Sequence, residues 1–220
     1  MATPAQKHFQ RVSAEQTAKA IGNEESVASG NIYELMLMQL ASHKRRLKEI
    51  QSVEQKIEVK REILPEYEAY ISGVLESDAG VQDDVLMTIL VWRVDTGDLW
   101  GALAIGEYAL HHKLVTPEQY KRDTATLLAE EIADYALRQA QDEKNILDMS
   151  LLLHTLDVTS KYDMPDQVRA KLHKALGFTM QQREKYAESL VHLHRALELD
   201  KNSGVKKRIE QVERLARTVE

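Results

Sequence analysis

The sequence contains no cysteine, which excludes disulfide bonds and thiolate metal sites. It also has few residues that interrupt helices, with 9 Gly and 4 Pro in 220 residues. Leu, Ala, Glu, Lys, Arg and Gln, which lose little side-chain freedom in a helix, fill long stretches instead. No segment carries a strand pattern. The sequence therefore predicts an all-α protein, and its 43% apolar content can furnish a core.

Long apolar runs are missing as well. The longest strongly apolar segment, Val85–Val91, is far shorter than the roughly 18 residues that a membrane span requires. The polar start of the chain lacks the apolar core of a signal peptide. We therefore expect no membrane contact, and a location in the cytoplasm.

Motifs of nucleotide, metal and nucleophile chemistry are also absent. No GxxxxGK[ST] or GxGxxG loop occurs, so a motor of the P-loop type is excluded and no cofactor is expected. The eight His residues form no HExxH arrangement, and no metal site is expected from them. No serine has the context of a nucleophile elbow. From the residues alone, an interaction protein is favoured over an enzyme, and no catalytic residue is assigned.

The charges are segregated although the net charge is −6. Residues 41–62 hold seven Lys/Arg against four Asp/Glu, and residues 201–217 hold six against two. A local basic surface can bind phosphates even on an acidic chain. Solvated helix faces are the alternative interpretation, both for the first block and for the second, which includes Lys206, Lys207 and Arg208. The expected DNA contacts are Lys7, Arg11, Lys44, Arg45, Arg46, Lys48, Lys56, Lys60 and Arg61.

Four acidic residues surround an apolar run near the middle of the chain. Asp83 and Asp84 precede it, where negative charge favours the start of a helix, and Asp95 and Asp98 follow it in a DTGD turn. The alternative is that these four carboxylates are the metal ligands of a magnesium-dependent endonuclease, which needs several acids around one or two ions. Both interpretations stay open from the residues alone.

Three regions are expected along the chain. Residues 1–30 are polar and predict a flexible arm containing a short helix. Residues 31–80 predict a long basic helix over 33–64, suited to oligomerisation, and a helical hairpin, because apolar residues from Leu40 to Leu64 follow one stripe. Residues 81–220 predict a domain of paired helices. The helices expected after residue 64 span residues 66–76, 83–94, 99–113, 126–141, 146–161, 166–182, 186–199 and 203–219.

Residues 170–203 resemble a tetratricopeptide (TPR) unit. Leu176 and Gly177 occupy the paired Leu-Gly positions, and Ser189, Leu193 and Ala196 follow at the expected steps. Small residues at these positions let two helices approach closely. The C-terminal half is therefore expected to be TPR-like.

The chain also resembles a known family over nearly its whole length. The segments that carry the likeness are ATPAQKHFQRVSA near the start, GVQDDVLMTILVWRVDTGDLWGALAIGEYALHHKL in the middle, and DMPDQVRAKLHKALG and SLVHLHRALELDKNSGVKKRIEQVERL near the end. It is similar to the small terminase subunit of temperate contractile-tailed bacteriophages, a family historically called the terminase endonuclease subunit. The resemblance implies viral DNA packaging in the host cytoplasm.

The partners that the resemblance implies are double-stranded phage DNA and the large ATPase subunit of terminase. The protein is then expected to bind the cohesive-end packaging site, recruit the large subunit and form a homo-oligomer, such as a ring. Two alternatives remain: a metal-dependent endonuclease that cuts the cohesive-end site itself, with Asp83, Asp84, Asp95 and Asp98 as ligands, and a TPR-like scaffold that binds only proteins.

Overall fold

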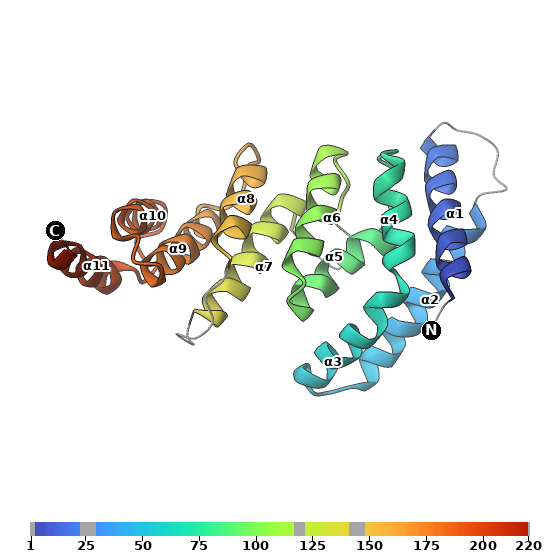
Figure 1. Cartoon of the computed structure of the whole chain (residues 1–220), viewed down its shortest axis with the longest axis horizontal. Helices are drawn as coiled ribbons and strands as arrows, with labels where there is room; N and C mark the ends of the chain where they lie inside the picture. The colour runs from blue at the N-terminus through green and yellow to red at the C-terminus, as the bar shows by residue number, and fades with distance from the viewer. Residues whose placement is uncertain (1–2, 23–29, 117–121, 141–147, 220) are drawn as a thin grey trace. The chain divides into compact units, whose positions relative to one another are not determined.

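The computed structural model describes residues 3–22, 30–116, 122–140 and 148–219. Within these ranges the chain is helical and has no strand, which confirms the all-α prediction. It divides into two compact units, residues 1–124 and 125–220, and the helices of each can be followed in Figure 1. Those of the first unit are α1 (Pro4–Gly22), α2 (Gly30–Glu49), α3 (Val53–Ile63), the short 3₁₀ helix η1 (Leu64–Glu66), α4 (Glu68–Ser77), α5 (Asp84–Thr96) and α6 (Leu99–His111). The second has α7 (Thr124–Gln139), α8 (Met149–Thr159), α9 (Asp166–Gln182), α10 (Tyr186–Leu199) and α11 (Lys206–Val219).

The long helix predicted over 33–64 is wrong, because the chain breaks between α2 and α3. Helix α2 ends at Glu49, and Ser52 is the N-cap of α3, where its hydroxyl accepts a hydrogen bond from the Gln55 N–H at 3.3 Å. The two helices form a hairpin that the ion pair between Arg46 and Glu62, at 2.9 Å, bridges. The buried stripe therefore belongs to two shorter helices that return on each other.

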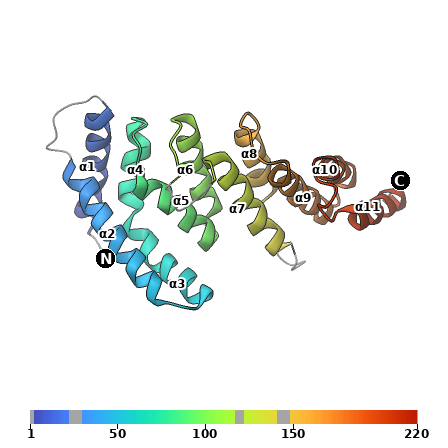
Figure 2. The ribbon, with the colours of Figure 1, turned by 180° about the vertical axis from the view of Figure 1, so that it is seen from behind.

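Helix α1 lies alongside α4 in both views of the first unit (Figures 1 and 2). Gly73 of α4 makes this close approach possible, because a Cβ there would be 2.2 Å from the carbonyl oxygen of Arg11 and 2.9 Å from the Ala14 Cβ. Ala14 and Ala18 are buried on the α1 side. The segment expected to be an arm thus contributes a helix to the core of the first unit.

Helix α5 is the centre of the first unit. Nine of its thirteen residues are buried, including Leu86 and Ile89 with no exposed surface, because α2, α3 and α6 all pack against it. The predicted break after α5 is confirmed: Gly97, with φ of 86°, ends the helix in the left-handed conformation that glycine adopts without strain. Asp98 then begins α6.

In the second unit, α9 and α10 pack closely around Gly177. A Cβ on Gly177 would be 2.6 Å from the Cδ2 of Leu193. The Ser189 hydroxyl donates a hydrogen bond of 2.7 Å to the Gly177 carbonyl and is fully buried. The small residues singled out in the sequence therefore lie at a real helix–helix contact.

Helix α11 covers the other side of α10. Val205, Ile209 and Val212 are buried against Leu193 and Ala196, with partly buried Phe178, Tyr186, Leu190 and Leu197 around them. The polar residues of α11 remain on its outer side. No described helix is long and apolar enough to cross a membrane.

The remaining helices begin and end close to where the sequence predicts them. Helices α9 and α10 have the predicted bounds, and α5, α6 and α7 differ by two residues or fewer at each end. Helix α8 is predicted from residue 146, but residues 141–147 lie outside the described part of the chain. The two compact units divide the chain at residue 124, whereas the sequence suggests boundaries at 30 and 80.

Candidate functional site

Asp83 is a buried helix cap. It is only 5% exposed, and its Oδ1 accepts a hydrogen bond from the Leu86 N–H at 2.8 Å, so it caps the N-terminus of α5. Its Oδ2 accepts a hydrogen bond from the Tyr70 hydroxyl at 2.6 Å. Burial raises the pKa of Asp83, while the hydrogen bonds from Tyr70 and from the helix backbone oppose that rise. These contacts give the carboxyl a structural role.

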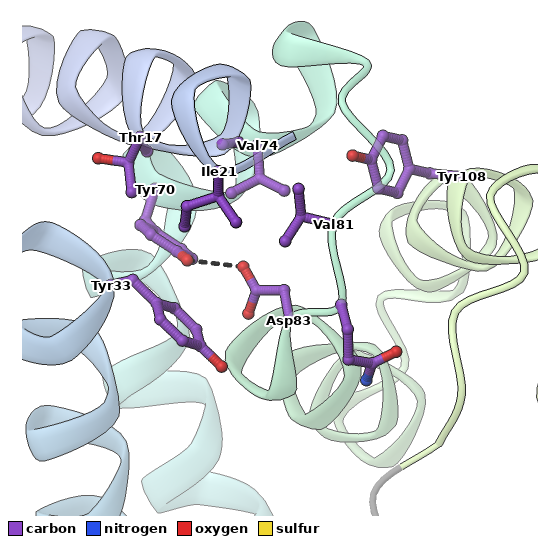
Figure 3. Close-up of a pocket in the computed structure, with 11 residues that line it drawn as sticks. Thr17, Ile21, Tyr33, Tyr70, Val74, Val81, Asp83 and Tyr108 are labelled. Atoms are coloured by element: carbon purple, nitrogen blue, oxygen red, sulfur yellow. Dashed lines mark hydrogen bonds between the residues drawn. The ribbon is translucent and has the colours of Figure 1, made fainter. Parts of the chain in front are cut away.

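A small cavity of about 150 Å³ lies beside this carboxyl. Figure 3 shows Asp83 and Tyr70 joined at its side, with Ile21 and Val81 around them and Tyr33 close by. The walls come mainly from apolar side chains of α1 and α4 and from three tyrosines, and Asp83 is the only acidic residue among the described ones that line it. A divalent ion needs several oxygen ligands, so this cavity does not suit a magnesium ion.

The other three acids have separate structural contacts. Asp84 is exposed in the first turn of α5, where its charge complements the helix dipole. Asp95 forms an ion pair with Lys60 of α3. Asp98 caps α6 by accepting the Gly101 N–H at 3.1 Å and pairs with Arg93 at 3.2 Å. No group of three or more His, Cys, Asp or Glu that could hold a metal ion occurs among the described residues.

Four of the nine basic residues expected at a DNA interface are paired within the protein. Lys60 pairs with Asp95, and the others pair with glutamates on the surface of the first unit. Intramolecular pairing lowers the charge that such a residue offers to a phosphate. The remaining pairs are Arg11 with Glu76, Arg46 with Glu62, and Arg61 with Glu58.

Lys44, a fifth residue of this set, is held by a hydrogen bond and not by an ion pair. Its ammonium group donates to the Thr88 hydroxyl of α5 at 3.3 Å, and it is half-buried. Burial lowers the pKa of Lys44, and the nearby charge of Asp84 partly opposes this. The side chain therefore points to α5 rather than into solvent.

Four cations of the expected set remain without an ion pair to any residue that the structure describes: Lys7, Arg45, Lys48 and Lys56. Lys7, Arg45 and Lys48 are exposed, and Lys56 is half-buried. Arg45 and Lys48 lie three residues apart on α2, which places them on neighbouring positions of one helix face. These four are the cations of the set that are best placed to meet a phosphate.

The same unit exposes several large apolar side chains. On α2, Met38 is 70% exposed and Leu35 is 50% exposed, and Phe9 of α1 is 71% exposed. Exposed apolar groups of this size are typical of protein contact surfaces when they lie together on one face. The apolar stripe in the sequence, which includes Leu40 and Leu47, corresponds to the buried side of α2. It does not include the exposed apolar residues of the same helix.

The second unit contains a basic arrangement that sequence patterns revealed only in part, since they singled out Arg208 but not its partners. The Arg208 guanidinium lies over the Phe178 ring, 4.3 Å from its centroid, and the Lys174 ammonium lies 5.7 Å from the same centroid. Lys174 also donates to the carbonyl of Ser203 at 2.8 Å. Phe178 is 30 residues before Arg208, so the two meet only because α9 and α11 both pack against α10.

Comparison with known proteins identifies a family and a relative that this chain resembles. Residues 37–167 match the phage small terminase subunit family. A protein of Escherichia phage P2 named "Terminase, endonuclease subunit" is 45% identical over 214 residues, which is 97% of this chain and 85% of that protein. No solved structure matches the chain significantly.

Proposed function

This chain belongs to the phage small terminase subunit family, and we propose that within phage DNA packaging it binds the viral cohesive-end site and recruits the large ATPase and nuclease subunit. The observation that carries the DNA-binding step is the set of unpaired cations on the first unit, chiefly exposed Arg45 and Lys48 on α2. Such cations release counterions when they meet phosphates, and this release favours binding to a duplex.

A homo-oligomer is part of this proposal. Four unpaired cations are few for a duplex-binding protein, but copies joined in a ring would present the set repeatedly and gain avidity. The exposed Leu35 and Met38 on α2 supply apolar surface for contact between copies. Native mass spectrometry would count the copies. A strictly monomeric protein at micromolar concentration would contradict this part of the proposal.

The cutting step is assigned to the large subunit. The P2 relative is named as an endonuclease subunit, so the alternative is that this chain cuts the cohesive-end site through Asp83, Asp84, Asp95 and Asp98. The contacts of these acids support the non-catalytic interpretation, since two cap helices and one pairs with a lysine. A carboxylate that serves as a helix cap is already directed at backbone N–H groups.

Recruitment of the large subunit is proposed for the second unit. Its α9–α10 pair comes from the segment whose sequence resembles a TPR unit, and Val191 on α10 is an apolar side chain that is 67% exposed. We expect Val191→Lys to weaken capture of the large subunit while cohesive-end DNA binding remains. Unchanged capture would contradict the use of this face.

The DNA-binding step is tested with two double variants that remove the same charge. Arg45→Gln/Lys48→Gln removes unpaired cations, and Arg46→Gln/Arg61→Gln removes cations already paired with Glu62 and Glu58. Affinity for cohesive-end DNA is measured at several salt concentrations. Loss of two phosphate contacts should lower the salt slope by about 1.8 in the first variant and less in the second. Equal effects, or none, would reject the assignment.

A further inference from the structure

Among the described residues, the cations on the outer side of α11 lack the acidic partners that several cations of the first unit have. The helix carries five Lys/Arg against two Glu. None of its cations forms an ion pair with another residue in the described part of the chain, whereas Arg11, Arg46, Lys60 and Arg61 of the first unit are all paired. The charge of α11 is therefore available to a partner outside the unit.

The position of these residues along α11 makes one surface. Lys207, Gln211, Arg214 and Thr218 follow at steps of four, three and four, which places them on one face of a helix, opposite buried Ile209. They line an open hollow of about 470 Å³ together with Leu215. All four side chains can donate hydrogen bonds, and none carries a negative charge.

Phe178 extends this surface toward α9. Its ring holds the Arg208 guanidinium at 4.3 Å and the Lys174 ammonium at 5.7 Å, so two like charges are kept near each other by an aromatic ring. Neither has an acidic partner among the described residues. An anion beside this ring would offset their positive charge, and both side chains are already held by contacts, which lowers the entropy lost on binding.

The composition of this surface favours nucleic acid over protein as the partner. Protein interfaces have an apolar or aromatic centre and are depleted in lysine. Residues 206–218 of α11, whose side chains the structure describes, include none of the large exposed apolar residues found on α1, α2 and α10. Protein–DNA interfaces are more polar and more positively charged. Glu210 borders this surface, since it lies three residues after Lys207 and four before Arg214, whereas Glu213 lies further round α11, away from Arg208.

We propose that Lys174, Lys207, Arg208, Gln211, Arg214 and Thr218, here called the α11 surface, bind the phosphate backbone of duplex DNA as a second contact, separate from the cations of α1–α3. The inference rests on the proposed DNA-binding function and extends it to the second unit. Contacts to phosphate carry no sequence information by themselves. The α11 surface should therefore strengthen binding to cohesive-end and unrelated duplexes alike.

The test uses the double variant Lys207→Gln/Arg214→Gln of α11. The control is Lys161→Gln/Lys185→Gln, which removes the same amount of charge from the second unit outside α11. Full-length proteins bind a labelled cohesive-end duplex and a scrambled duplex over a salt series. We expect the α11 variant to lose roughly 10- to 100-fold in affinity at about 0.1 M salt on both duplexes, with a salt slope smaller by about 1.8. The control variant should retain most of the affinity.

Several outcomes would overturn the inference. If wild type binds the duplex and the α11 variant, folded by circular dichroism, has the same affinity and slope, then the α11 surface does not bind DNA while the proposed function stands. If the variant loses the large subunit and keeps its DNA affinity, the partner is an acidic protein surface. If wild type binds neither duplex, both the proposed function and this inference fail.

Discussion

The Tyr70 hydroxyl donates a 2.6 Å hydrogen bond to Asp83 Oδ2 inside the first unit, while Oδ1 of the same carboxyl caps α5. Asp83→Ala leaves both the tyrosine and the helix N-terminus without this acceptor. We expect it to lower the free energy of unfolding by about 2–4 kcal/mol, the sum of a lost cap and a lost buried hydrogen bond. Urea denaturation measures the change.

Asp84→Ala is the matched control for that substitution. Asp84 is exposed and contributes charge to the first turn, so its removal should cost only about 0.3–1 kcal/mol. Equal costs at the two positions would contradict the different roles given to these adjacent carboxylates.

The same acids predict the outcome of a cleavage assay. With Mg²⁺ and cohesive-end DNA, the purified protein should leave the duplex intact, because Asp95 and Asp98 are occupied by Lys60 and Arg93 and not directed at a shared ion. Gel electrophoresis of end-labelled DNA gives the readout. Cleavage by wild type that disappears in Asp84→Ala, with the fold retained, would support the endonuclease alternative.

Two glycines of the first unit should respond differently to an added methyl group. Gly73→Ala places a Cβ 2.2 Å from the Arg11 carbonyl oxygen, a backbone atom, so α1 must move away from α4. We expect a loss of about 1–3 kcal/mol or more in stability. At Gly22 the nearest atom would be at 3.4 Å, and Gly22→Ala should change stability little. Thermal unfolding of the two variants measures the difference in stability. Equal melting temperatures would contradict the packing described for α1.

His173 and His192 predict a pH dependence in the second unit. Their Nδ1 atoms are 2.9 Å apart across α9 and α10. Burial, the neighbouring His192, and Arg195 and Arg169 lower the pKa of His173 to about 4, and burial lowers the pKa of His192. Both imidazoles therefore bind protons more weakly in the folded protein than in the unfolded chain. Their contribution to stability is therefore full above about pH 6.5 and is lost as the pH falls toward about 4.

Substitution of the pair checks this prediction. The urea midpoint of wild type should fall faster between pH 6.5 and pH 4 than that of His173→Gln/His192→Gln, because the variant has no imidazole to protonate at this contact. Parallel curves for the two proteins would show that the pair does not titrate as the geometry predicts. Asp83 is common to both proteins, so its own titration cancels in the comparison.

Several helices could be predicted from local patterns because residues at their ends mark where they begin or stop. The DTGD turn, for example, supplies both the glycine that ends α5 and the aspartate that begins α6. The break between α2 and α3 contains no Gly or Pro, so the apolar stripe runs on through it and predicts one continuous helix. Ser52 followed by Gln55 is a capping-box pattern, and this signal indicates a helix start at the position where α3 begins.

The state of the charged side chains could not be predicted from spacing. Lys44, Arg45, Arg46 and Lys48 are close in sequence, yet Lys44 bonds to Thr88, Arg46 to Glu62, and the other two to no described side chain. Thr88 is 44 residues away from Lys44. Which cations are neutralised depends on such distant partners, and these are set by the packing of the helices.

The close approach of Arg11 to Gly73 changes how truncations of this protein should be interpreted. A shortened version that starts after residue 22 would remove Lys7 and Arg11, but it would also strip the cover from Tyr70 and Val74 on α4. Poor DNA binding by that version would report a damaged fold as readily as a missing phosphate contact. Point substitutions on the outer side of α1 separate the two effects, whereas removal of the whole leading segment merges them.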